Sequence, residues 1–292
     1  MTKEREGELF MIGVSVFESW FPILSIISLS AIGALHTYAL ALLISLIFFF
    51  FIILKKNLFK ELKNVDAYKP LLLTSFWITT LFVLIFLGMR YTTAGNVSVI
   101  IFLQLFFSYL YFHVFGKEKI DFIHALGAFI MGIGAIIVLF PETLSFNKGD
   151  WLILVAAAIA PIANLYSQRA RNFCSSELIL GFRTFFALPV ISFFAWYFEP
   201  SLSLENLKVA MPYVLIIGLF IFGLSKIFWM EALHRISITK VSAMVALVPV
   251  LTLLFAYLYL NEVPELRQFI GVFPIVIGGY LLTKPLKKTE AV

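Results

Sequence analysis

Long apolar runs separated by short polar turns dominate the chain. Runs of about 20 residues, the length that a helix needs to cross a bilayer, recur ten times. They lie at about 9–29, 34–54, 70–89, 94–115, 121–140, 151–168, 177–198, 211–231, 237–260 and 268–283. The runs are continuous and do not alternate with period two, which excludes a membrane β-barrel. The pattern predicts an all-α integral membrane protein with ten transmembrane helices.

The first apolar run follows Lys3 and Arg5, as the core of a signal peptide would. It extends over about 21 residues, lacks an A-x-A cleavage signal and leads directly into another span. We therefore predict that it is retained as the first transmembrane helix.

Composition agrees with a membrane protein, since 61% of the residues are hydrophobic and only 13% are charged. A net charge of +5 could also indicate a nucleic-acid partner, so the positions of the charges decide. With the N-terminus inside, 16 of the 22 Lys and Arg residues fall in cytoplasmic segments. Outside fall only Arg90, Lys148, Lys208 and Arg267. This bias predicts a multi-pass protein of the plasma (inner) membrane with both termini cytoplasmic, and no nucleic-acid partner.

The chain also repeats itself. A shift of 144 residues places Glu118 on Glu262 and matches glycines of the fifth span with glycines of the tenth. Because each repeat holds five spans, an odd number, two tandem copies enter the membrane from opposite sides. We predict two inverted five-helix repeats, residues 1–140 and 141–292. Such repeats commonly build alternating-access transporters with a binding site near the midplane, although duplication alone can also give a stable bundle.

Several motifs carry a family resemblance. They are Gly149-Asp150, Ala232-Leu233 before a basic residue, the midspan proline of Leu247-Val248-Pro249, Glu262, Gly271 and Gly278. Over residues 7–285 the chain resembles the EamA-type transporters of the drug/metabolite transporter superfamily. The resemblance implies a ten-helix secondary transporter, often an exporter of amino acids, metabolites or xenobiotics. It also implies a central cavity formed mainly by the first four helices of each repeat.

Glu18, Arg183 and Lys226 are the charged residues well inside predicted spans. An ionised side chain at the membrane centre costs about 2.5–3.5 kcal/mol on insertion scales, so each needs a partner, a wet cavity or a neutral state. Lys226 could pair with Glu18 across the repeats or with a carboxylate of a solute. Arg183 could face the cavity or extend to the cytoplasmic surface.

Glu18 belongs to a polar stripe on the first span, together with Ser15, Pro22 and Ser25 at helical spacing. We predict that this stripe faces the cavity, and that Pro22 frees a backbone carbonyl there. A buried carboxyl group could exchange a proton or bind a cationic solute. The alternative is a permanently protonated Glu18 that only forms hydrogen bonds within the bundle.

Neutral polar and aromatic residues on other spans extend the predicted site. The predicted substrate-binding residues are Ser15, Glu18, Trp20, Trp77, Asn96, Gln104, Ser108, Tyr111, Asn164, Lys226 and Trp229, with Glu18 also coupling protons. Donors beside aromatic rings suit a small amphipathic or aromatic solute. The alternative for each is an interhelical hydrogen bond, worth about 0.6 kcal/mol.

The predicted function is secondary transport of a small organic solute, with export the favoured direction. Partners would be the solute, the lipid bilayer and protons, and the protein would be a monomer or homodimer. Scattered histidines and the lone Cys174 indicate no metal site or cofactor. No clustered catalytic set is visible, so an enzyme is not expected. The alternatives are an uncoupled facilitator, a membrane-embedded enzyme or a lipid-handling protein.

Overall fold

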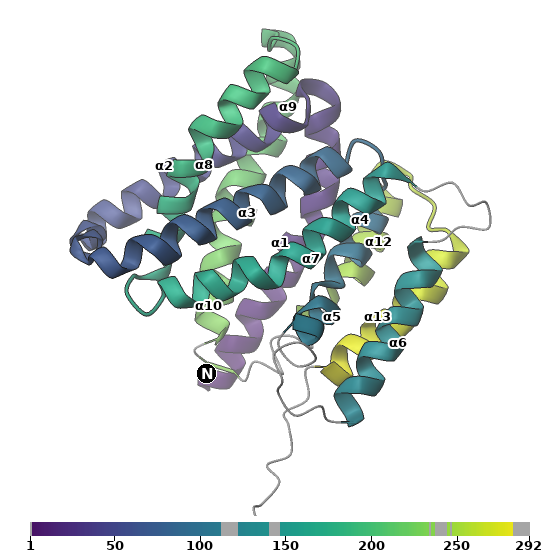
Figure 1. Ribbon diagram of the computed structural model, residues 1–292. Coiled ribbons are helices and arrows are strands. Elements are labelled where there is room, and N and C mark those ends of the chain that lie inside the picture. The colour runs from purple at the N-terminus through teal and green to yellow at the C-terminus, as the bar shows by residue number, and fades with distance from the viewer. Residues whose placement is uncertain are drawn as a thin grey trace, which may run out of the picture.

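The structure is a computed structural model that describes residues 2–111, 122–139, 147–233, 235–236, 244–245 and 247–282 (Figure 1). In that part of the chain every regular element is helical. The five longest described helices are α1 (Lys3–Ile32), α2 (Ala34–Lys56), α3 (Tyr68–Gly88), α7 (Lys148–Ala170) and α8 (Ser176–Phe198). The others are α4 (Ala94–Phe102), α5 (Gln104–Tyr109), α6 (Phe122–Leu139), α9 (Leu204–Ile216), α10 (Ser225–Leu233), α12 (Leu247–Leu260) and α13 (Leu266–Leu282). The 3₁₀ turns η1 (Leu58–Lys63) and η2 (Val65–Ala67) lead into α3, and the π-helix η4 (Ile217–Leu224) joins α9 to α10.

Six helical segments of the described chain are long and apolar enough to cross a membrane. They are α1, α2, Val65–Gly88, α7, α8 and Leu204–Ala232. Four shorter apolar helices, Ala94–Tyr109, Phe122–Gly134, Leu247–Leu260 and Leu266–Leu282, lie within the other four predicted spans. The all-helical, multi-pass membrane class is confirmed. A count of ten spans stays a prediction, and the predicted boundary at 140/141 lies outside the described residues.

The contacts between helices follow a symmetry between the two halves of the chain. When each helix is replaced by its counterpart in the other half, one packed pair becomes another packed pair. α1 packs against α10 as α3 packs against α7, and α1 packs against α12 as α4 and α5 pack against α7. The pairs α2–α8, α4–α12 and α6–α13 map onto themselves under the same exchange. The interior is therefore shared by both halves.

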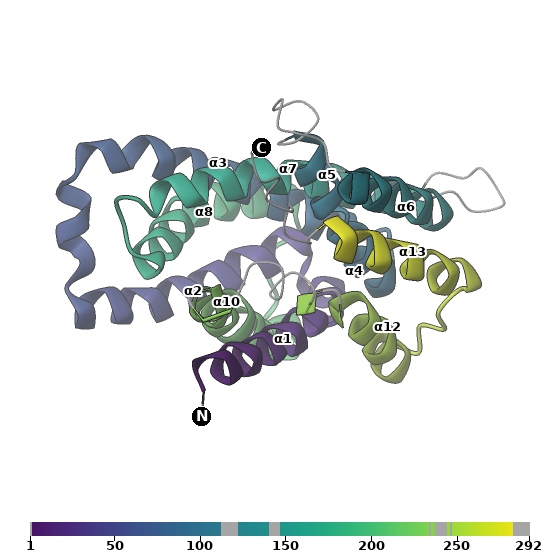
Figure 2. The same cartoon turned by 90° about the horizontal axis from the view of Figure 1, so that it is seen from below.

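Helices α6 and α13 stand together at one side of the molecule, far from α2 and α8 (Figures 1 and 2). Their glycines let the two backbones touch. A Cβ on Gly278 would lie 2.5 Å from the Gly127 carbonyl oxygen, and one on Gly134 would lie 2.7 Å from that of Gly271. These glycines allow close helix packing, because both contacts are with backbone atoms that a side chain would have to displace.

Carboxylates of the second half hold the N-termini of helices in the first half. Glu199, at the end of α8, accepts hydrogen bonds from the backbone N–H groups of Leu35 (3.0 Å) and His36 (2.9 Å), which start α2. Gly33 precedes that helix with a φ of 89°, and a Cβ there would lie 2.5 Å from the Glu199 carboxylate. The negative charge and the free N–H groups suit each other at a helix N-terminus. Glycine is thus needed at this turn.

Candidate functional site

The interior charges meet where α1 and α10 pack together. Lys226 donates from Nζ to Oε1 of Glu18 at 2.7 Å, and the Ser225 hydroxyl donates to the same oxygen at 2.7 Å. The side chains of Lys226 and Glu18 are 27% and 24% exposed, so the pair is neither sealed nor freely hydrated. The predicted contact between Glu18 and Lys226 is confirmed. It joins the first half of the chain to the second.

Two local features of the backbone accompany this pair. Pro22 lies inside α1 and has no N–H, so the carbonyl of Glu18, four residues earlier, lacks its helical donor. On the opposite side, the eight π-helical residues of η4 end directly before Ser225. π-Helical turns are uncommon and concentrate at functional sites. Both helices of the contact therefore carry a backbone irregularity within about one turn of the charged residue.

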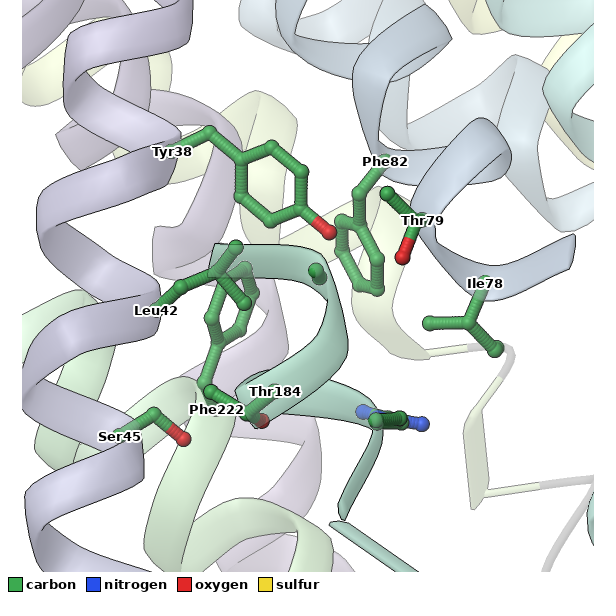
Figure 3. A pocket seen from close by; sticks show the side chains of 10 residues that line it. Tyr38, Leu42, Ser45, Ile78, Thr79, Phe82, Thr184 and Phe222 are labelled. Atoms are coloured by element: carbon green, nitrogen blue, oxygen red, sulfur yellow. The ribbon is translucent and has the colours of Figure 1, made fainter. Parts of the chain in front are cut away.

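A pocket beside the pair lies between α2, α3, α8 and η4 (Figure 3). Its lining residues are Tyr38, Leu42, Ser45, Ile78, Thr79, Phe82, Arg183, Thr184, Ala187 and Phe222. The free space holds about one water molecule. Among the described residues, Arg183 is the only charged one in the lining, and the Glu18 carboxylate is close enough to act on it electrostatically. Arg183 thus lines the interior, which decides between the two predicted orientations.

Aromatic rings form one wall of the pocket. Tyr38 stacks on Phe86 with ring centroids 5.0 Å apart, and Phe82 meets Phe222 edge-on at 4.9 Å. Phe21 of α1 touches the same group through Phe82, Phe86 and Phe222. The Tyr38 hydroxyl points toward Thr79 (Figure 3). The pocket therefore offers an apolar, ring-lined side next to a polar side.

Three residues predicted to bind solute make contacts that tie helices together. The Ser15 hydroxyl donates to the backbone carbonyl of Met244 at 3.1 Å. The Trp20 ring stacks on Phe255 at 4.8 Å and meets Tyr259 edge-on at 4.6 Å, so it packs against α12. Both side chains interact with other helices of the bundle, as the alternative to solute binding predicted. Neither residue lines the pocket.

Asn96 is the third of these residues, because it is buried in a network among α4, α7 and α13. Its side-chain amide donates to both oxygens of Asp150, at 3.2 and 3.1 Å, and accepts from Nε2 of Gln268 at 2.7 Å. Next to it, Glu262 accepts from the backbone N–H of Ala94 at 3.1 Å and so caps the N-terminus of α4. Asn96 thus forms interhelical hydrogen bonds, and its role in binding a solute stays a prediction.

The remaining predicted residues lie outside the lining of this pocket. Trp77 is partly buried and meets Phe76 edge-on, one residue away from the pocket residue Ile78. Trp229 packs in a cluster around Met11. Gln104, Ser108, Tyr111 and Asn164 are partly or fully exposed on α5, its C-terminal end and α7. Their predicted role in binding stays a prediction.

Polar residues that line the pocket beside Arg183 are absent from the predicted binding residues. Tyr38, Leu42 and Ser45 follow each other at i, i+4 and i+7 on the second span, so they share one face. Helical spacing of this kind also marks the polar stripe on the first span, and it is the signal, although a weak one, that the sequence holds for this face. Ser225 was missed because a small residue beside a lysine gives no distinctive signal.

Together, the fold and the site define a class: a helical, multi-pass membrane protein whose two halves meet at interior charges. The chain belongs to the EamA-like transporter family, which matches residues 5–140 and 147–284 as two copies.

Curated relatives agree with that family. The chain is 25% identical over 200 residues to "Uncharacterized transporter YoaV" of Bacillus subtilis, covering 67% of this chain and 68% of that one. It is 26% identical over 215 residues to "WAT1-related protein At3g02690, chloroplastic" of Arabidopsis thaliana, covering 68% and 50%. A solved structure described as "Crystal structure of protein" superposes with a TM-score of 0.68 at 17% identity, covering 95% and 96%, which shows the shared fold. The chain is thus a membrane transporter of the drug/metabolite type.

Proposed function

We propose that this protein is a secondary transporter that moves a small organic solute across the plasma membrane by alternating access. Its halves, residues 1–140 and 141–292, would be inverted repeats of five spans, with both termini cytoplasmic and export as the favoured direction. The exchange of helix pairs between the halves supports this arrangement. Inverted repeats allow one half to rock against the other around a central site.

The observation that carries the proposal is the Glu18–Lys226 ion pair between the halves. Ionisable residues inside a membrane are expensive, and they mark solute or ion pathways. Here the charges lie on the two helices, α1 and α10, whose contact must change when the halves rock. A proton on Glu18 would remove the attraction to Lys226, so proton binding and movement of the halves would be linked.

The experiment begins by finding a solute, because the solute sets the transport assay. Thermal unfolding of purified protein is measured with amino acids, polyamines, nucleosides, quaternary ammonium compounds and organic acids, since a ligand stabilises the state that binds it. Solutes that raise the unfolding temperature are then tested for flux in proteoliposomes under an imposed pH gradient. We expect wild-type flux to respond to the gradient and Glu18→Gln flux to lose that response.

The matched control is Glu205→Gln, which neutralises an exposed carboxylate in the first turn of α9. It should keep the response to the gradient. Wild-type flux that ignores the pH gradient would refute proton coupling and leave an uncoupled facilitator. A complete lack of solute flux for every stabilising compound would contradict the transport proposal itself.

A further inference from the structure

Arg183 is an interior charge that takes no part in the Glu18–Lys226 ion pair. Glu18 and Lys226 compensate each other, and no described carboxylate forms an ion pair with Arg183. An arginine side chain does not become neutral by losing its proton under ordinary conditions, so its charge stays in the interior. Its guanidinium lines a pocket whose other nine lining residues carry no charge. Within the described residues, the pocket therefore has a positive group with no carboxylate at ion-pair distance, and Glu18 acts on it only from farther away while bound to Lys226.

The neutral polar groups around Arg183 also favour an anion. The Ser45 hydroxyl is buried on α2 and forms no hydrogen bond with the described part of the chain, so its proton is available to a guest. The Thr184 hydroxyl, by contrast, is used, since it donates to the carbonyl of Leu180 at 2.7 Å. A guanidinium and a hydroxyl that both donate match a carboxylate, which only accepts.

The rest of the lining suits an apolar body attached to that carboxylate. Phe82 and Phe222 lie on one side, with Leu42, Ile78 and Ala187 completing the wall. The free space holds about one water molecule, so it fits a small headgroup rather than a whole solute. The body of the solute would enter when the halves separate, as alternating access requires.

From this geometry we propose that Arg183 binds the carboxylate of the transported solute, and that the solute class is organic acids with an apolar or aromatic body. This inference rests on the proposed transport function and names the substrate class of its central pocket. A bound carboxylate would compensate the interior positive charge. The occupied and empty pockets would then differ in net charge, which favours the organic anion over its neutral analogues.

The test compares ligands that share a carbon skeleton but differ in charge. Thermal unfolding of the purified full chain is measured with increasing phenylacetate, its uncharged amide phenylacetamide, and the cation phenethylamine, with hexanoate as an aliphatic acid. We expect phenylacetate or hexanoate to raise the unfolding temperature in a saturable way, and the amide and the amine to have no such effect. Equal stabilisation by the acid and its amide, or stabilisation by the amine alone, would overturn the proposal.

Three variants connect the effect to the residue. Arg183→Gln should weaken the apparent Kd for the acid about tenfold or more, because a charge-assisted hydrogen bond is lost. Arg183→Lys, which keeps the charge but loses the planar fork, should weaken it less. Arg169→Gln, at an exposed arginine near the end of α7, should bind like the wild type. An unchanged affinity in Arg183→Gln would contradict the assignment.

Binding and transport can fail separately in this design. If Arg183 governs acid binding but proteoliposomes show no flux, the pocket assignment stands and the proposed function fails. If another class of solute is transported equally well by the wild type and Arg183→Gln, the proposed function stands and the pocket assignment fails. Should Arg183→Gln not fold, Ser45→Ala gives a second variant, with an expected loss of a few-fold in acid affinity and none in the unfolding temperature of the free protein.

Discussion

Replacement of Lys226 by methionine isolates the energy of the interior ion pair. Methionine fills similar space but leaves the Glu18 carboxylate with the Ser225 hydroxyl as its remaining partner. Removing one partner of a fully buried pair costs about 3–5 kcal/mol. Because both side chains are about a quarter exposed, we expect a smaller loss of about 1–3 kcal/mol. For a chain of this size the unfolding temperature should fall by roughly 2–10 °C.

The double variant Glu18→Gln with Lys226→Met gives the decisive comparison. It removes both charges of the pair, so neither Glu18 nor Lys226 is left without its partner, and the unfolding temperature should return most of the way to the wild-type value. Unfolding is followed by intrinsic tryptophan fluorescence in one detergent, with Lys208→Met as an exposed control. The reasoning is refuted if Lys226→Met unfolds at the wild-type temperature, or if the double variant is less stable than Lys226→Met.

Three further predictions concern packing, capping and pH. Gly278→Ala should cost about 1–3 kcal/mol because its Cβ would press on backbone atoms 2.5 Å away, whereas Gly132→Ala, with its nearest neighbour at 3.8 Å, should unfold like the wild type. Glu199→Ala should lower stability by about 0.5–2 kcal/mol by leaving the N-terminus of α2 uncapped, and an unchanged midpoint of thermal unfolding would count against this cap. Burial raises the pKa of Glu262 above 4.5, so the stability that its protonated form contributes is lost as the pH rises through that raised pKa. A pH series should show this loss in the wild type and not in Glu262→Gln; parallel curves would refute it.

The sequence predicted the elements and interior charges better than it predicted the lining of the site. Apolar runs and lysine positions mark membrane helices because lipid and water impose a strong length and charge constraint. The Glu18–Lys226 contact was predictable for a related reason, since an interior charge needs a partner. Both predictions follow from the free energy of placing a charge in the membrane, and they do not require the rotation of each helix about its axis.

The residues that line the pocket depend on how each helix is rotated about its axis, and the sequence gives only a weak signal for this rotation. A helix face toward lipid is as apolar as one toward another helix, so periodicity does not tell them apart. Trp20 and Asn96 look suited to a solute, yet the structure places them against α12 and Asp150. Ser45 is indistinguishable in sequence from a serine that bonds its own helix, as Ser75 does with Leu71.

The π-helical segment η4 makes the ion pair depend on chain length as well as on residue type. Each residue advances an α-helix by about 100° around its axis, and a π-helical turn accommodates more residues than an α-helical turn. If 217–224 formed regular α-helix with the same number of residues, Lys226 would be turned away from Glu18, although both residues were still present. In a related chain, the spacing before the lysine thus decides whether the two charges meet.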